Sequence, residues 1–275
     1  MKLMRILALF FLMLALWIKG DHDVDVVQAQ QKAFHWGFKK ATNENPPSIA
    51  EEGYADLVQA YDALFYDHSG KKILYLTFDN GYENGFTPAI LDVLKEKHVS
   101  ATFFVTGHYI EDQPDLLKRM VQEGHIIGNH SWSHPDMSTL NADRIRQEIE
   151  KVNSAIAQIT QQKETVYFRP PRGIFNEHVL KMVRDMGMET IFWSIAYKDW
   201  ERDVSRGKEY AYQQVVKQFH PGAVILLHSV SKDNAEALGM IIDEARRQGY
   251  TFESLDAWRI KRRGHPLLDL LSLQN

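Results

Sequence analysis

Short apolar runs alternate along most of the chain with longer segments whose apolar positions recur every three or four residues. The short runs are rich in β-branched and aromatic residues, which favours strands, and the longer segments have the period of a helix. Glycine follows several of these segments, as at Gly124 and Gly187, which is typical of a helix C-terminus. The predicted strands are 73–78, 101–106, 125–129, 167–169, 190–195, 223–227 and 251–254, and the predicted helices are 88–97, 114–123, 142–161, 177–186, 209–219 and 234–248.

This alternation predicts an α/β fold, a single distorted (β/α) barrel with about seven parallel strands. A doubly wound open sheet is the alternative, because periodicity does not distinguish a closed sheet from an open one. A length of 275 residues suits one domain of this kind.

The N-terminus has the pattern of a targeting segment. Lys2 and Arg5 give the first residues a positive charge, and residues 6–18 then form an uninterrupted apolar run of 13. A transmembrane helix needs about 20 such residues, whereas this length suits the apolar region of a signal peptide. We therefore expect a signal peptide over residues 1–29, an exported protein and no permanent membrane span. An uncleaved N-terminal anchor is the alternative, because residues 19–26 make a long spacer with three aspartates.

Residues 30–70 are polar and aromatic and carry a loop signal at 43–47, Asn-Glu-Asn-Pro-Pro. We interpret them as an N-terminal extension, with a helix near 52–66, packed on a main domain of residues 71–260. A C-terminal tail of residues 261–275 follows.

The composition is that of an ordinary folded domain, with 44% hydrophobic and 25% charged residues. A net charge of −4 argues against a nucleic-acid partner, and we expect a monomer. Cysteine is absent, so disulfides and thiolate metal sites are excluded. Any metal must be bound by His, Asp, Asn or Glu.

Chemically reactive side chains follow several predicted strands. Asp79 and Asn80 follow strand 73–78, and His228 follows strand 223–227. The carboxyl ends of barrel strands converge on one face, so these side chains are expected to meet there. Asp-Asn-Gly at 79–81 is also good turn chemistry by itself, but the convergence of several such clusters indicates a hydrolase.

His130 and His134 are four residues apart, a spacing that allows two imidazoles to share one cation. Two ordinary loop histidines before Pro135 are the simpler interpretation. With Asn80 as a third ligand, the site would have nitrogen and oxygen donors, which suits zinc or another divalent transition metal.

Two further clusters carry cations and carboxylates. The segment Arg169-Pro-Pro-Arg172 is stiffened by its prolines, and Arg169 is either a structural salt-bridge partner or the group that keeps Asp79 ionised. Asp199 bonded to His228 would orient the imidazole and favour its protonated form, as a general acid requires. Trp200, close in sequence, is either core or part of a sugar-stacking wall.

In this order, Thr-Phe-Asp at 77–79, His-x-x-x-His at 130–134, Arg-Pro-Pro at 169–171 and Leu-Leu-His at 226–228 resemble the polysaccharide deacetylase family. This family has the NodB homology domain and is carbohydrate esterase family four, and the resemblance covers residues 72–256. The segments 77–85 and 169–173 are similar to one branch, the muramic δ-lactam-forming N-acetylmuramic acid deacetylases of spore-forming bacteria.

The resemblance implies a role for each side chain and a divalent metal cofactor. The implied roles are Asp79 as general base, Arg169 as its partner, His228 as general acid tuned by Asp199, His130, His134 and Asn80 as metal ligands, and the Arg172 N–H as an oxyanion donor. Most family members have aspartate where this chain has Asn80, which implies a weakly bound metal.

The resemblance implies an enzyme that removes the acetyl group of N-acetylmuramic acid from peptidoglycan strands, a step toward muramic δ-lactam in the spore cortex, and acts in the cell wall. Arg172, through the lactyl carboxylate, and Trp200 are the expected substrate contacts. A deacetylase of N-acetylglucosamine polymers and a non-catalytic peptidoglycan-binding protein with a decayed metal site are the alternatives. A glycosidase would need two carboxylates flanking the bond, and only Asp79 and Asp199 offer themselves.

Overall fold

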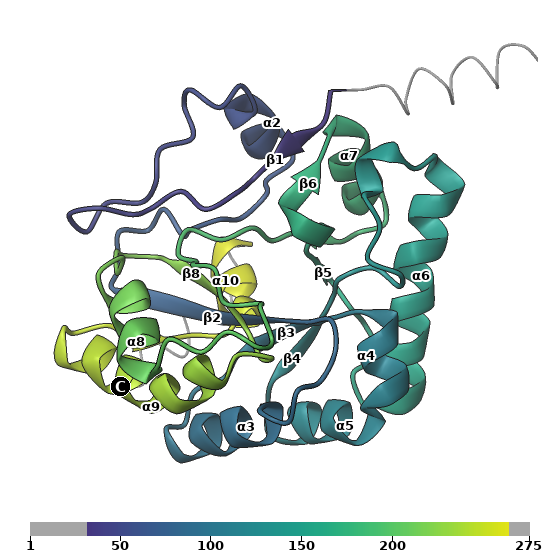
Figure 1. Ribbon diagram of the computed structural model, residues 1–275. Helices are drawn as coiled ribbons and strands as arrows, with labels where there is room; N and C mark the ends of the chain where they lie inside the picture. The colour runs from purple at the N-terminus through teal and green to yellow at the C-terminus, as the bar shows by residue number, and fades with distance from the viewer. Residues whose placement is uncertain (1–31, 264–275) are drawn as a thin grey trace, which may run out of the picture.

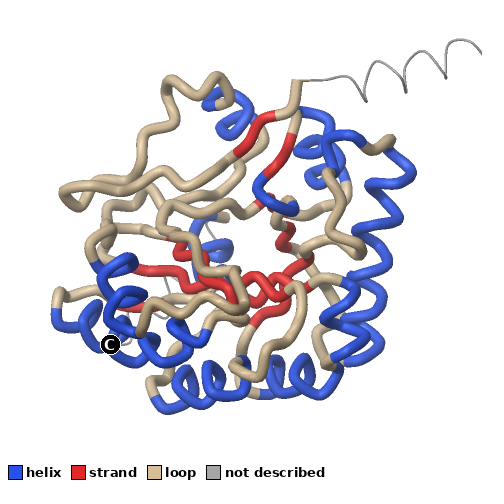
Figure 2. The backbone as a smooth tube through the Cα atoms, viewed as in Figure 1, coloured by secondary structure: helices blue, strands red, loops and turns tan. Residues whose placement is uncertain are grey.

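A computed structural model describes residues 32–263, which form a curled parallel sheet inside a layer of helices (Figures 1 and 2). The strand order is β7-β5-β4-β3-β2-β8, and β9 pairs with β2. The predicted α/β fold with about seven parallel strands is therefore confirmed. The predicted signal peptide and nearly all of the predicted tail lie outside the described residues. The strands are β2 (Ile73–Asn80), β3 (Thr102–Val105), β4 (Ile126–Asn129), β5 (Tyr167–Phe168), β7 (Glu189–Thr190), β8 (Val224–His228) and β9 (Thr251–Phe252).

The helices cover the outer face of the sheet, and α3, α5 and α6 surround it along the bottom and one side of Figure 1. Several begin at a residue whose side-chain oxygen accepts a backbone N–H of the first turn, as Asn141 does for α6 and Ser231 for α9. The helices are α2 (Ala55–Ala60), α3 (Thr87–Glu96), α4 (Gly107–Asp112), α5 (Pro114–Gln122), α6 (Ala142–Ile159), α7 (Glu177–Asp185), α8 (Lys208–Val216), α9 (Lys232–Arg247) and α10 (Leu255–Arg262), with short 3-10 turns at Met137–Thr139 and Pro171–Gly173. None of the helices between residues 32 and 263 is both long and apolar enough to cross a bilayer.

β2 lies inside the sheet between β3 and β8, and all eight of its residues are buried. Its neighbours are in parallel register, so Asp79 lies beside Phe104 of β3 and His228 of β8. The ends of β2 and β8 therefore bring Asp79 and His228, two of the side chains expected to meet, next to each other.

The predicted strand 190–195 is too long, because the regular strand β7 ends at Thr190. The carbonyl groups of Ile191 and Phe192 accept hydrogen bonds from the Arg169 side chain at 3.1 Å each, in place of ladder bonds. The chain then crosses to β8, where the N–H of Leu226 donates to the carbonyl of Ile195 at 2.9 Å. This irregular segment connects the two edges of the sheet.

The N-terminal segment, residues 32–66, packs against the sheet and its edges (Figure 1), and Tyr66 pairs with Ala223 just before β8. Its strand β1 (Phe34–His35) pairs antiparallel with β6 (Ile174–Phe175), a two-stranded sheet that the sequence pattern did not reveal. The predicted helix 52–66 is shorter than expected, since α2 ends at Ala60. The N–H of Leu64 donates instead to the carbonyl of Thr190 at 2.9 Å, and this pairing excludes a helix there.

Gly128 in β4 makes room for the aromatic ring of Phe104. A Cβ atom at position 128 would lie 2.6 Å from that ring. The Arg169 guanidinium carbon lies 4.1 Å from the centre of the Phe104 ring, so the glycine also determines the position of a buried cation.

We expect Gly128→Ala to lower the free energy of unfolding by about 1–3 kcal/mol, the usual cost of overpacking a core. Urea denaturation followed by circular dichroism measures this. Gly239→Ala in α9 is the matched control, because its new Cβ would lie 3.8 Å from its nearest neighbours. Alanine is favoured over glycine in a helix by about 0.5–1 kcal/mol, so this control should be more stable. Unchanged stability of Gly128→Ala would contradict the packing argument.

Candidate active site

A cavity of about 640 Å³ opens at the carboxyl ends of the strands. Six of the nine side chains singled out from the sequence line it, and the other three, Asn80, Arg169 and Asp199, lie buried behind its wall. A larger hollow of about 990 Å³ lies beside the start of β2 and contains none of the nine. The six that line the smaller cavity are Asp79, His130, His134, Arg172, Trp200 and His228.

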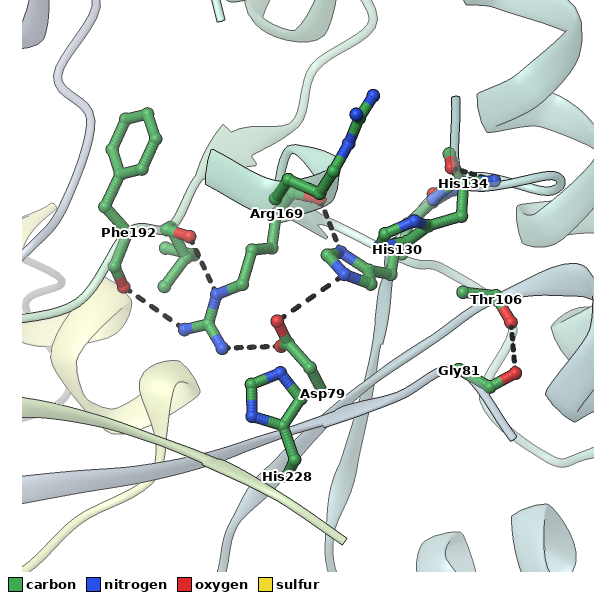
Figure 3. A network of polar contacts seen from close by, with 12 residues as sticks. Asp79, Gly81, Thr106, His130, His134, Arg169, Phe192 and His228 are labelled. Carbon is green, nitrogen blue, oxygen red and sulfur yellow. Dashed lines mark hydrogen bonds and ion pairs between the residues drawn. The ribbon is translucent and has the colours of Figure 1, made fainter. Parts of the chain in front are cut away.

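Asp79 and Arg169 form a buried ion pair at the base of the cavity (Figure 3). The Arg169 side chain donates to Asp79 Oδ1 at 2.8 Å, and it is entirely excluded from solvent. Its other donors bind the carbonyl groups of Ile191 and Phe192. The guanidinium is therefore held by a carboxylate, two carbonyls and the ring of Phe104.

The environment of Asp79 favours its ionised form. Burial by itself would raise the pKa of Asp79, but its interaction with the charge of Arg169, followed by those with the His130 and His228 rings, holds the pKa below its usual value. Asp79 is consequently a carboxylate at neutral pH.

His228 and Asp199 form a second pair, on the other side of Asp79. His228 Nδ1 lies 2.7 Å from Asp199 Oδ1, and the backbone N–H of His228 donates to Asp199 Oδ2 at 2.8 Å. Asn234 from the first turn of α9 also donates to Oδ2, at 2.6 Å. Because Nδ1 is engaged, Nε2 is the ring nitrogen available to the cavity.

Two opposing effects determine the charge of His228. Burial lowers its pKa, but the negative charge of Asp199 and its hydrogen bond outweigh burial, with a further contribution from Asp79, so the pKa is raised. His228 thus tends to be protonated beside an ionised Asp79.

His130 and His134 lie on the loop after β4, with their ring centres 5.0 Å apart. Ser131 and His134 have positive φ angles of 64° and 56°, which cost energy for residues with a side chain. Hydrogen bonds hold this conformation: Asn129 Oδ1 accepts from the N–H of Ser131 at 2.8 Å, and Glu148 accepts from both the N–H and the hydroxyl of Ser133 at 2.7 Å.

The surroundings of His130 favour a neutral imidazole. Burial lowers its pKa, and the opposing charge of Asp79 does not reverse this. Nδ1 lies 2.8 Å from the carbonyl oxygen of Arg169, to which only an N–H can donate. Nε2 then carries the lone pair, which can bind a cation, and it lies 3.5 Å from Asp79 Oδ2.

Asn80 is fully buried and does not line the cavity. Its amide nitrogen donates to the hydroxyl of Ser229 at 2.7 Å, and its Oδ1 is buried without a hydrogen-bond partner. Unsatisfied acceptors of this kind are rare in folded proteins.

These donors fit a divalent transition metal, because imidazole and amide oxygen are both accepted ligands. Within residues 32–263, no three His, Cys, Asp or Glu side chains gather as a metal-binding group. A site built on His130 and His134 would therefore need a neutral third ligand, and the unpartnered oxygen of Asn80 is the candidate from the sequence.

The two predicted substrate contacts lie at the mouth of the cavity. The Arg172 side chain is half exposed, and its guanidinium makes a long ion pair of 3.9 Å with Asp136. Arg172 has a positive φ of 57°, and its carbonyl group accepts a hydrogen bond from His35 at 2.9 Å. Trp200 is 37% exposed, and its ring centre lies 5.7 Å from that of His228.

His35 and Phe38 are among the residues of the N-terminal segment that line the cavity, and the sequence interpretation did not select them. Neither follows a strand of the main sheet, so the rule about strand ends could not identify them. The run Phe-His-Trp-Gly-Phe at 34–38 was the available signal, since such a dense aromatic run in a polar segment needs a surface to pack on.

Comparison with known proteins agrees with this geometry. Residues 67–191 match the family model for polysaccharide deacetylase. The chain is 52% identical, over 81% of its length and 84% of the relative, to the peptidoglycan-N-acetylmuramic acid deacetylase PdaA of Bacillus subtilis. The solved structure of that protein, a family 4 carbohydrate esterase, superimposes with a TM-score of 0.81 at 50% identity, covering 84% of this chain and 98% of that one. A family 4 pseudoenzyme from Bacillus anthracis gives a TM-score of 0.67 at 34% identity, covering 71% and 68%.

Asp199→Asn should lower the pKa of His228. The substitution removes the charge that raises this pKa and leaves burial, which lowers it. The fraction of protonated His228 at neutral pH should therefore fall, and any rate that needs the imidazolium should decline at a lower pH than in the parent protein. NMR titration of the His228 ring measures the shift, with His220, which bonds to Ser194 away from the cavity, as the internal control. An unchanged titration of His228 would show that Asp199 does not set its charge.

Proposed function

Since the chain belongs to the polysaccharide deacetylase family, we propose that it is an exported peptidoglycan deacetylase that hydrolyses the acetamide group of N-acetylmuramic acid. One observation carries the proposal. Asp79 and His228 are paired in register on adjoining strands, and each is held by a buried partner of opposite charge. A carboxylate and an imidazolium side by side in one cavity are the base and the acid that amide hydrolysis requires.

Asp79 acts as the general base. It takes a proton from the water that attacks the acetamide carbonyl carbon, and Arg169 keeps it ionised and oriented while it does so. The lowered pKa that keeps it ionised also makes it a weak base.

His228 acts as the general acid. When the C–N bond breaks, its Nε2–H donates a proton to the leaving amine nitrogen, and the products are acetate and the free amino sugar. Asp199 stabilises the imidazolium that this step needs, because it holds Nδ1 at 2.7 Å.

The oxyanion that forms on the acetamide oxygen needs donors as well. We assign the backbone N–H of Arg172 to this task, and the proline-stiffened turn Pro171–Gly173 presents it beside the cavity. His130, His134 and Asn80 would hold a divalent metal, which when bound supplies Lewis-acid polarisation of water and carbonyl and so compensates for the weak base.

Arg172 is the residue that we assign to recognition of the lactyl group. N-acetylmuramic acid differs from N-acetylglucosamine by a lactyl carboxylate, and a guanidinium offers paired donors to a carboxylate. The Arg172 side chain lines the cavity, is half exposed and makes only a long contact with Asp136. Removal of the acetyl group also exposes an amine that can attack the lactyl carboxyl group. The reaction is therefore a step toward muramic δ-lactam, which we expect to be its purpose in a spore cortex.

The alternative of a non-catalytic glycan-binding protein deserves a direct test, because the family includes a pseudoenzyme. The two buried ion pairs argue against it, since binding alone needs neither. A deacetylase of N-acetylglucosamine polymers would share both pairs and would differ in its use of Arg172.

We expect acetate release from peptide-free peptidoglycan strands, and a loss of about 10²–10⁴-fold in Asp79→Asn, which removes the base. The variant also leaves the buried Arg169 without its counter-charge, a loss that typically costs about 3–5 kcal/mol of stability. Acetate should be measured enzymatically on protein that circular dichroism shows to be folded. Parent-like turnover in Asp79→Asn, or no release by the parent protein with zinc or other divalent ions supplied, would contradict the proposal.

Arg172→Leu should raise KM for N-acetylmuramic acid substrates by about tenfold or more, as expected for loss of a charge-assisted contact. KM for N-acetylglucosamine oligomers, if they are turned over, should change little. Arg172→Lys is the matched control, because it keeps the charge and loses the paired donors. Its KM for N-acetylmuramic acid substrates should lie between those of the parent protein and Arg172→Leu. Equal losses on both sugars would assign Arg172 to the geometry of its turn.

A further inference from the structure

Phe38 and Trp200 meet at the edge of the cavity and form an aromatic pair. Their ring centres lie 5.2 Å apart, and the ring planes are inclined by 16°. The ring centre of Trp193 lies 6.1 Å from that of Phe38. Phe38 is 42% exposed and Trp200 37% exposed, although both are large apolar side chains, and all three line the cavity.

The position of Phe38 is fixed by the two residues that precede it. The Trp36 indole N–H donates to the carbonyl of Trp193 at 2.8 Å, and the Trp193 indole N–H donates back to the carbonyl of Gly37 at 3.0 Å. Trp36 is 2% exposed and stacks on Phe192, with ring centres 4.3 Å apart. We call this reciprocal contact the indole clasp.

Gly173 allows the indole clasp to close. A Cβ at this position would lie 2.8 Å from the Trp193 ring and 3.0 Å from Trp36 Cβ. The N–H of Trp36 also donates to the carbonyl of Gly173 at 2.9 Å. The N-terminal segment is therefore bound firmly to the walls of the cavity, and Phe38 projects from a rigid base.

We propose that Phe38 and Trp200 form a second sugar subsite, which binds the glycan unit next to the one that is deacetylated. A pyranose ring presents C–H groups on its faces, and these pack on aromatic rings, whose faces carry partial negative charge. Trp200 lies 5.7 Å from His228, so a sugar on this pair adjoins the position where the leaving amine is protonated. The inference rests on the proposed function for the identity of the chain that passes through the cavity.

This subsite gives the N-terminal segment a direct part in substrate recognition. The cavity of about 640 Å³ falls in the range of pockets that enclose a drug-sized ligand and is much larger than an acetyl group requires. Longer glycans should therefore bind more tightly than single sugars.

The test compares Phe38→Ala with the parent protein in binding a peptide-free peptidoglycan tetrasaccharide and the monosaccharide N-acetylmuramic acid, by calorimetry. The variant should bind the tetrasaccharide about tenfold more weakly, as loss of one apolar contact predicts, and its preference for tetrasaccharide over monosaccharide should fall by the same factor. KM for the tetrasaccharide should rise more than kcat falls. Phe38→Tyr keeps the ring and should match the parent, and Met240→Ala, an exposed apolar residue of α9, controls for loss of surface area.

Equal tetrasaccharide affinity in Phe38→Ala and the parent would overturn the subsite, and so would equal losses for both sugars, which would mean that Phe38 only supports the fold. If Phe38→Ala does not fold, the fluorescence of Trp200 is measured instead. The tetrasaccharide should quench tryptophan fluorescence in the parent protein, and this change should be absent in Trp200→Phe. No quenching in the parent protein would overturn the subsite. Failure of the proposed function would give a different result. The parent protein would then release no acetate even though it binds the tetrasaccharide.

Discussion

The buried ion pair between Arg169 and Asp79 is the interaction on which the carboxyl end of the barrel depends. Removing two charges from water costs several kcal/mol for each ion, and the pair persists only because every side of the guanidinium is compensated. Two carbonyls of the segment after β7 accept its remaining donors, and the ring of Phe104 covers its face. The absence of a side chain at Gly128 allows that ring to lie where it does. Gly128, Phe104 and the irregular segment after β7 thus all help to hold the arginine that pairs with Asp79.

The two ion pairs of the site shift two pKa values in opposite directions. A guanidinium beside Asp79 lowers the pKa of a carboxyl group, and a carboxylate beside His228 raises that of an imidazole. Both groups are therefore charged at the same pH, and since they lie at paired positions of adjoining strands, each opposite charge also favours the other. When the surroundings shift the pKa values of two neighbouring groups in opposite directions, one site can contain an acid and a base together.

The sequence predicted the parts of the fold and site that follow from strand ends. Asp79 and His228 meet because both end parallel strands, and the pairing of Arg169 with Asp79 was open to prediction from charge alone. Periodicity could not reveal where β7 ends, because the carbonyls just beyond it bind the side chain of Arg169, a residue distant in sequence. Nor could it show that Phe38 reaches the cavity, since its position depends on hydrogen bonds from the Trp36 and Trp193 indoles to backbone carbonyls far away in sequence. Asn80 was selected as a metal ligand from spacing and resemblance, and its orientation toward Ser229 required the structure.

The Arg169 side chain connects the chemistry of the site to the completion of the fold. Its acceptors Ile191 and Phe192 follow β7 directly, where the N–H of Ile191 donates to the carbonyl of Phe168 at 2.8 Å. Without this segment in place, the guanidinium would lack two of its acceptors and Asp79 would lack a fixed partner. An ordered segment after β7 is consequently a condition for the oriented carboxylate at the base of the cavity.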